Sequence, residues 1–137
     1  MADTIRKVAY YKVEVPNRPG EGVRLLGALR EAGVNLLAFT GFPHGRKAQI
    51  DFIPEDEAAF KRAAKEAGLK VGAKKSCFLV QGEDRVGAVA EILSKLAAAK
   101  INVTAVDAIV AGGGRYGVIL WVKSEAVAKT KRLLGAV

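Results

Sequence analysis

Residues 17–35 read NRPGEGVRLLGALREAGVN, a stretch that predicts a tight turn, one amphipathic helix and the start of a strand. A similar stretch follows 67 positions later (85 − 18 = 67), and seven residue pairs at this offset are identical or alike. The pairs are Arg18 and Arg85, Gly20 and Gly87, Leu26 and Leu93, Leu29 and Leu96, Ala32 and Ala99, Val34 and Ile101, and Asn35 and Asn102. A fixed offset that holds over so many positions indicates an internal duplication. We therefore expect two copies of one small domain, residues 1–73 and 74–137.

Composition places the chain among globular proteins. Of its 137 residues, 50% are hydrophobic and 26% are charged, which is typical of a folded chain and not of a disordered or fibrous one. A copy of about 65 residues would bury only a marginal core by itself. We therefore expect the two copies to share an interface, or the chain to form a homodimer, or both.

The sequence points to the cytoplasm. Its first residues are charged and include no apolar leader, and no apolar run approaches the roughly 18 residues of a membrane helix. Cys77 is the only cysteine, so no disulfide can form within the chain, as is typical of a reducing compartment. We expect a cytoplasmic protein without a membrane partner, in which Cys77 is buried in a strand.

The positive charge of the chain raises the question of an anionic partner such as nucleic acid. The net charge is +8 and the pI is near 9.8. The basic residues are scattered, however, and several stand among acids, as Lys61 does after the acidic residues 55–57. A solvated, slightly cationic surface is the favoured interpretation.

Each copy is predicted to follow the order strand, helix, strand, strand, helix, strand. Hydrophobic periodicity places these segments at 10–15, 19–32, 34–42, 47–53, 54–67 and 69–71 in the first copy. The second copy has strands at 76–81, 101–110 and 116–122, one helix ending near 100 and another at 125–134, and little chain for a last strand. The apolar stripes of the two leading helices begin at Val23 and Val86. This order predicts an α+β fold of two tandem ferredoxin-like domains, each an antiparallel sheet with its helices on one face.

Two strands of the second copy are apolar on both faces. Residues 77–80 and 118–122 show no alternation, whereas residues 49–52 alternate. An antiparallel sheet covered by helices on one side normally carries polar residues on the other. We therefore expect the second face of this sheet to be buried, through docking of the copies or self-association.

The turn and helix motif resembles the signature of the ACT domain family, in which an N/D-R-P-G turn leads into a helix that ends in G-[IV]-N. The first copy has Asn17-Arg18-Pro19-Gly20 and, after the helix, Gly33-Val34-Asn35. The second has Asp84-Arg85-Val86-Gly87 and Ile101-Asn102, with Val86 in place of proline and Lys100 in place of glycine. The resemblance covers nearly the whole chain and implies a stand-alone tandem ACT protein.

This resemblance implies a regulatory sensor that binds a small molecule, most often an amino acid, near the strand-to-helix turn at an interface between domains. Unpaired N–H groups at a helix N-terminus suit a ligand carboxylate, and an asparagine amide can both donate and accept. No cofactor is implied. The expected ligand-binding residues are Asn17, Arg18, Pro19, Gly20 and Asn35 in the first copy and Asp84, Arg85, Gly87 and Asn102 in the second.

The two asparagines of the first copy also have a purely structural interpretation. Asn17 would serve equally well as a helix cap, a role that asparagine fills often. Asn35 would serve equally well by bonding the backbone of the turn that follows the helix. The sequence leaves both interpretations open.

The two turn arginines precede a helix, where a positive charge is unfavourable. Their presence in both copies indicates either an anionic partner or a salt link to a nearby acid. The salt link, from Arg18 to Glu21 or from Arg85 to Glu83, is the favoured interpretation.

Catalysis finds little support. His44, the only histidine, lies in a predicted hairpin turn and Cys77 lies in an apolar strand, so neither a nucleophile and base pair nor a metal cluster can be assembled. The glycine-rich residues 112–115 join two strands and lack the Lys-Ser/Thr of a phosphate loop. We expect a protein that is not an enzyme and holds no metal.

Two other functions remain as alternatives. Residues 115–121 weakly resemble the third-strand motif of an RNA-recognition sheet, which has the same element order. That mode needs stacked aromatic side chains, whereas Ile119 and Leu120 occupy the middle of this strand. Nucleic acid is therefore the less favoured partner. The other alternative is a structural dimerisation module that binds no ligand.

Overall fold

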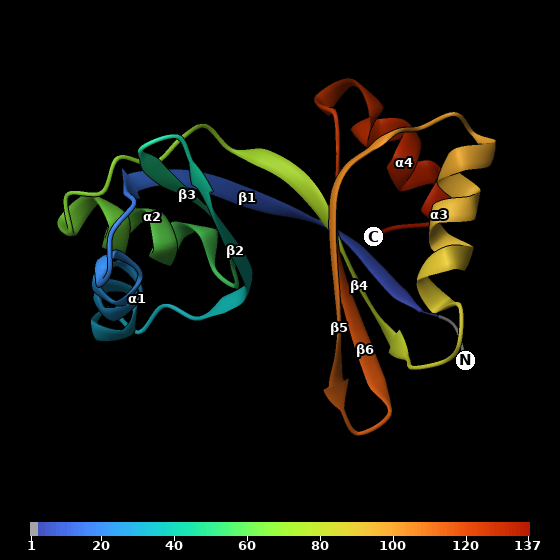
Figure 1. Cartoon of the computed structure of the whole chain (residues 1–137), viewed down its shortest axis with the longest axis horizontal. Helices are drawn as coiled ribbons and strands as arrows, with labels where there is room; N and C mark the ends of the chain where they lie inside the picture. Colours follow the sequence, from blue (N-terminus) through green and yellow to red (C-terminus); the bar gives the residue numbers. More distant parts are fainter. Residues whose placement is uncertain (1–2) are drawn as a thin grey trace. The chain divides into compact units, whose positions relative to one another are not determined.

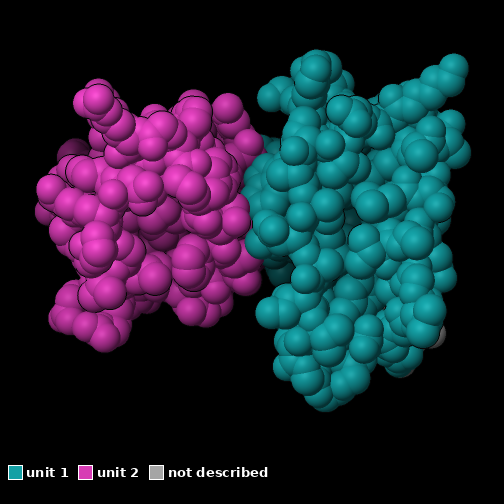
Figure 2. All heavy atoms as spheres, in the orientation of Figure 1, with its two compact units in different colours: residues 1–8, 76–137 teal, residues 9–75 magenta. Residues whose placement is uncertain are grey.

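A computed structural model describes residues 3–137, which form an α+β structure of six strands and four α-helices (Figure 1). The chain divides into two compact units, which Figure 2 colours separately. Unit 2 is residues 9–75, and unit 1 consists of residues 1–8 and 76–137. The strand pairs with a resolved register, β1 with β3, β2 with β3, β4 with β6 and β5 with β6, are antiparallel, as the sequence predicts.

Unit 2 contains the second part of β1 (Thr4–Pro16), followed by α1 (Glu21–Glu31), β2 (Leu36–His44), β3 (Lys47–Pro54) and α2 (Glu57–Glu66). Its strands lie in the order β2-β3-β1. A single bridge between Val13 and Val71 stands where the sequence predicts a short strand at 69–71. The backbone N–H of Gly72 donates to the carbonyl of Lys12 at 2.8 Å, so this segment runs beside β1 without forming a full strand.

The core of unit 2 follows from the alternation in β1. Tyr11, Val13 and Val15 are buried, because alternate residues of a strand point to the same face. They pack with side chains from both helices and from β3, namely Leu25, Leu29, Phe52, Phe60 and Ala63. The Tyr11 hydroxyl donates to Glu57 Oε1 at 2.6 Å and so ties β1 to the start of α2.

Unit 1 contains β4 (Lys75–Glu83), α3 (Ala88–Ala98), β5 (Val103–Gly112), β6 (Arg115–Val122), the 3-10 turn η1 (Ser124–Ala126) and α4 (Val127–Leu134). Its strand order is β1-β4-β6-β5, with the first part of β1 next to β4 and β5 at the other edge. The buried side chains of α3, Ala88, Ile92 and Leu96, pack on those of β4 and β6 to form the core.

The start of β1 belongs to unit 1, together with residues 76–137, whereas the expected division at residues 73 and 74 would assign it to the first copy. In unit 1 the start of β1 lies beside β4, at the edge of the sheet. Val137 adds two backbone bonds to this segment, since Lys7 N donates to Val137 O at 2.9 Å and Val137 N donates to Ile5 O at 3.0 Å.

The apolar stripes predicted for the two leading helices are wrong at their first positions. Val23 is 79% exposed, and Val86 is fully exposed in the turn before α3. The buried residues are Leu25 and Leu29 in α1 and Ala88, Ile92 and Leu96 in α3. Leu29 and Leu96 belong to the predicted stripes, whereas Leu25 and Ile92 precede the predicted Leu26 and Leu93 by one position. The helices start after Gly20 and Gly87, so Val86 precedes its helix and Val23 lies on the exposed side of α1.

The sheet of unit 1 carries apolar side chains on the face opposite α3, as the sequence predicts, and what covers that face stays a prediction. Phe78 and Val80 belong to the core with α3, so the alternate residues Cys77 and Leu79 point to the opposite face. Both are buried, and so is Trp121 on β6. The interpretation of Cys77 as a small buried residue in a strand is correct.

Candidate ligand site at the start of helix α3

Helices α1 and α3 begin in the same way, on a left-handed glycine. Gly20 has φ 92° and Gly87 has φ 79°, and each occupies the N-cap position without any side chain capping the helix. A residue with a Cβ is strained at such angles, so the duplicated glycine is required by the turn. The two turns therefore present the first backbone amides of each helix in the same conformation.

Two amides in each helix have no acceptor within the described chain. In α3, Ala88 N donates to Arg85 O at 3.3 Å and Glu91 N to Gly87 O at 3.1 Å, which leaves Val89 and Ala90. In α1 the equivalent amides are those of residues 22 and 23. Unpaired N–H groups at a helix N-terminus carry a positive potential and favour an anion.

Asn17 does not cap α1, so the structural interpretation of this residue is wrong. Its backbone N–H donates to the carbonyl of Arg46 at 3.2 Å. This bond joins the end of β1 to the turn between β2 and β3. Asn35 does not bond the turn through its side chain either. Its Nδ2 donates to Glu55 Oε2 at 3.0 Å, which ties the start of β2 to the residue that follows β3.

The first turn of α1 already holds a carboxylate of the chain. Glu21 is 9% exposed and accepts hydrogen bonds from Arg24 Nη2 at 2.9 Å and from Arg18 Nε at 3.0 Å. Arg24 and then Arg18 lower the pKa of Glu21, because both stabilise the carboxylate. The predicted salt link of Arg18 to Glu21 is confirmed.

The first turn of α3 differs at this position, because Ala88 replaces Glu21 at the repeat offset (88 − 21 = 67). A cavity of about 260 Å³ opens here and is lined by Val89 and Ala90, whose amides are unpaired. The preceding turn contributes Asp84, Arg85 and Gly87. The opposite wall consists of the β5 residues 108–110 and of Tyr116 on β6. The turn, the unpaired amides and an open space thus coincide in unit 1.

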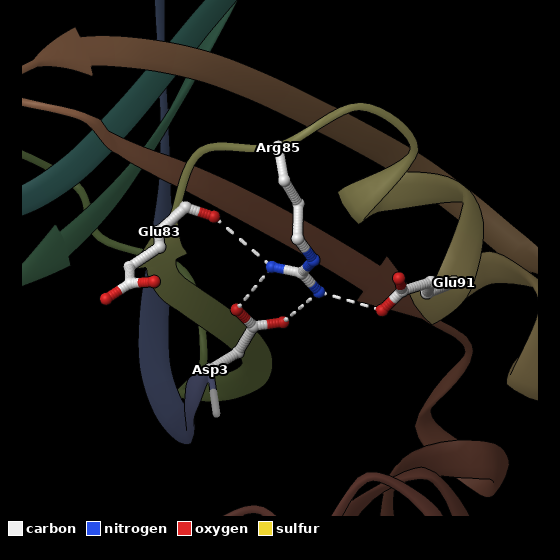
Figure 3. A network of polar contacts seen from close by, with 4 residues as sticks. All are labelled: Asp3, Glu83, Arg85 and Glu91. Atoms are coloured by element: carbon white, nitrogen blue, oxygen red, sulfur yellow. Dashed lines mark hydrogen bonds and ion pairs between the residues drawn. The ribbon is translucent and has the colours of Figure 1, made fainter. Parts of the chain in front are cut away.

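Arg85 ties this turn to the start of β1 (Figure 3). Its Nη1 donates to Asp3 Oδ1 and to the backbone carbonyl of Glu83, both at 3.2 Å, and its Nη2 donates to Glu91 Oε2 at 2.8 Å. The predicted salt link to the Glu83 side chain is therefore wrong, since Glu83 contributes only its carbonyl. Asp3 lies 82 positions away in sequence and reaches Arg85 because β1 runs next to β4.

The network stabilises its charged forms. Burial works against the carboxylate of Asp3, but Arg85 and Tyr116 together outweigh it, so the pKa of Asp3 lies below its ordinary value. Arg85 likewise lowers the pKa of Glu91. Burial raises the pKa of Tyr116, and the adjacent Asp3 carboxylate raises it further. At neutral pH the guanidinium thus faces two carboxylates, with a neutral phenol beside them.

The expected site residues fall into two groups. Asp84, Arg85 and Gly87 lie together at the cavity, and residues 17–20 form the matching turn before α1. Asn102 follows the C-terminal end of α3, an 11-residue helix of about 16 Å. Asn35 likewise follows α1 and lines a different cavity, of about 390 Å³, with Gly33 and Leu36. Within one unit, the asparagines and the turn do not form one site.

Sequence reasoning missed the residues that complete the cavity from other strands. Tyr116 lies far from the turn in sequence, and the β5 wall carries no motif. Asp3, which binds Arg85 but does not line this cavity, lies 82 positions from Arg85. The repeat offset was the one available signal, because it places Ala88 where the first copy has Glu21. Among the described residues, no group of three or more His, Cys, Asp or Glu side chains is arranged to hold a metal ion.

Comparison with solved structures identifies the fold. The chain is similar to protein BT0572 from Bacteroides thetaiotaomicron, with 16% identity, a TM-score of 0.81, and 97% of this chain and 88% of that chain covered. It is similar to the ligand-free regulatory subunit of aspartate kinase from Thermus thermophilus, with 15% identity, a TM-score of 0.63, and 98% and 95% covered. A structure of aspartokinase alpha and beta subunits gives 18% identity, a TM-score of 0.62, and 98% and 95% covered.

These likenesses, all at low sequence identity, show the fold, and the fold is consistent with the ACT resemblance of the two turns. No family model matches the sequence, and no curated protein is significantly similar to it. No helix in residues 3–137 is long and apolar enough to cross a bilayer.

Proposed function

We propose that the protein is a regulatory, non-catalytic protein with two tandem ferredoxin-like ACT domains, which binds an amino acid at the turn before α3. The ligand carboxylate accepts hydrogen bonds from the amides of Val89 and Ala90, and the ligand ammonium group pairs with Asp84. The observation that carries this proposal is the cavity of about 260 Å³ beside those two amides. The shared fold of the aspartate kinase regulatory subunit supports a regulatory role.

The second copy is the proposed working site, because the cavity lined by Val89 and Ala90 lies there. Asn35 and Asn102 lie at the far ends of their helices from the turns. We therefore propose that both asparagines contact a ligand only where their domain meets another domain. The same proposal applies to the turn before α1, residues 17–20. The ligand in that case lies between domains, as the ACT resemblance implies.

We also propose a cytoplasmic homodimer. The edge strands β2 and β5 expose large apolar side chains, with Phe39 at 48%, Phe42 at 44% and Ile109 at 70%. Exposed apolar edge strands favour pairing with another chain. Sedimentation equilibrium should give twice the 14.5 kDa mass of the chain, and a monomer at micromolar concentration would contradict the dimer.

The test of the ligand proposal is a thermal-shift screen of the common amino acids. A ligand that binds the folded protein alone stabilises it by about 2.7 kcal/mol at a hundredfold excess over its dissociation constant. For a chain of this size that gain raises the melting temperature by roughly ten degrees. One amino acid, or a few of similar chemistry, should produce this shift.

A matched pair of proline variants tests the assigned site. Val89→Pro removes one of the unpaired amides, and proline is tolerated in the first turn of a helix because no helical hydrogen bond is lost. Gly22→Pro makes the same change at the equivalent position of α1. The shift should disappear in Val89→Pro and persist in Gly22→Pro. A full shift in Val89→Pro would show that the pocket lies elsewhere.

The alternatives give different results in the same screen. An RNA-binding protein should show no amino-acid shift and an affinity for RNA that falls steeply with salt. A structural dimerisation module should show neither response.

A further inference from the structure

We propose that the α3 cavity selects a small amino acid with an uncharged aliphatic side chain. This inference rests on the proposed function and adds the chemical class of the ligand. It follows from three properties of the cavity: the apolar wall formed by β5, the engagement of its only cation, and the single carboxylate in its lining.

The wall opposite α3 is apolar. Ala108 and Val110 pair with Val118 and Tyr116 across the β5–β6 ladder, so they point to the face of the sheet that carries the core with α3. Val110 remains 57% exposed, although it lies beside the core. A ligand side chain that covers this surface gains from the removal of apolar area from water. The cavity is smaller than the roughly 300–1,000 Å³ that drug-sized ligands occupy, which favours a small ligand.

The cavity offers no free cation to an acidic side chain. Arg85 is the only basic residue in its lining, and both terminal nitrogens of the guanidinium are engaged by Asp3, Glu91 and the Glu83 carbonyl. The unpaired amides of α3 are taken by the α-carboxylate of the ligand. A second carboxylate would therefore lie against the apolar β5 wall without a partner, which is costly.

The cavity also offers no free carboxylate to a basic side chain of the ligand. Asp84 is the only carboxylate in the lining, and the ligand ammonium group occupies it. The Tyr116 hydroxyl lies beside the Asp3 carboxylate, which helps to keep it protonated, so it adds no negative charge to the lining. A neutral aliphatic side chain is what remains compatible with this lining.

The test is calorimetric titration of the full chain with valine, leucine, aspartate and lysine. We expect valine or leucine to bind at least tenfold more tightly than aspartate or lysine. Asp84→Asn should weaken the binding of the aliphatic ligand by roughly ten- to a hundredfold, because it removes a charged hydrogen-bond partner. Equal binding of all four ligands would overturn the proposal.

A charge placed on the wall should change the preference. Val110→Lys should weaken valine and leucine by at least tenfold and strengthen aspartate. Val106→Lys introduces the same charge on β5 outside the cavity and should change neither. Both positions are exposed on an edge strand, which tolerates lysine. An unchanged preference in Val110→Lys would show that the β5 wall does not contact the ligand.

The outcomes separate this inference from the function on which it rests. If aspartate or lysine binds and Val89→Pro abolishes that binding, the ligand class is wrong and the sensor function stands. If no amino acid binds at all, both are wrong.

Discussion

At the scale of single residues, the contact between Asp3 and Arg85 depends on a residue that has no side chain. A Cβ at Gly82 would overlap the carboxylate of Asp3 and would lie 2.9 Å from the ring of Tyr116. Gly82 therefore admits the close approach of β1 to β4 where the salt link forms. Its φ is not left-handed, so the constraint comes from the neighbours and not from the backbone.

Gly82→Ala should displace Asp3 from Arg85 and lower the free energy of unfolding by about 1–3 kcal/mol, since a charged hydrogen bond is lost in a nearly buried place. Gly117→Ala is the matched control on the neighbouring strand, because its Cβ would meet only Val80 O at 3.7 Å. Urea denaturation measures both. Equal stabilities of the two variants would contradict the role given to Gly82.

Tyr11 and Glu57 provide a second prediction at this scale, for alkaline pH. Burial and then Glu57 raise the pKa of Tyr11 to about 12. Its folded pKa thus exceeds the unfolded value of about 10, so the corresponding stability is complete below pH 10 and is lost as the pH rises towards 12. Melting temperatures of the wild type and of Tyr11→Phe should converge over this range. A constant difference between them would refute the assignment.

At the scale of elements, β1 contributes to two compact units. It is 13 residues long, against the 3–10 that strands usually have, and its first part occupies the edge of unit 1. Val137 is 78% exposed and is attached there by two backbone hydrogen bonds. Val137 thus pairs with the first part of the strand.

Removal of residues 136 and 137 should destabilise unit 1 by about 1–3 kcal/mol, as expected for two backbone hydrogen bonds. Amide exchange at Lys7 should accelerate, because Val137 O is its acceptor. Amide exchange at Phe52, in the core of unit 2, should change less. Unchanged protection at Lys7 in the shortened chain would argue against this pairing.

Most elements could be predicted from the sequence, because alternation in residues 10–15 and helical spacing after each glycine are strong local signals. The start of β1 could not. Residues 4–9 show no alternation, and their partner strand lies some 70 positions away. The salt link of Arg18 to Glu21 was predictable because it is local, whereas Arg85 pairs with Asp3 through the sheet. Of the residues that line the cavity, only those of the turn before α3 could be predicted, because the opposite wall is brought there by tertiary packing.

At the scale of the whole molecule, the carboxylates determine the response to acid. Hydrogen bonds from basic or phenolic groups lower the pKa of Glu21, Glu57 and Glu91, and Arg85 lowers that of Asp3 against its burial. Each contributes stability that is present above the unfolded pKa of about 4 and is lost as the pH falls through the lower folded value. Asp51 opposes this trend, because burial raises its pKa.

The melting temperature should therefore be nearly constant from pH 7 to about 5 and fall steeply below about pH 4. Asp3→Asn should show a shallower fall than the wild type, since it lacks one of the four groups. Differential scanning calorimetry across this range provides the measurement. Parallel curves for the two proteins would indicate that Asp3 does not contribute to acid unfolding.

The sharing of β1 has a consequence for dissection of the gene. A break between the two repeats, after residue 73, would yield a C-terminal fragment without its edge strand, which should be insoluble or disordered. Addition of a synthetic peptide of residues 1–8 should rescue that fragment by complementation. The two units therefore cannot be separated by a cut where the second repeat begins. A permuted chain that starts at residue 9 and carries residues 1–8 after residue 137 would keep each unit continuous in sequence.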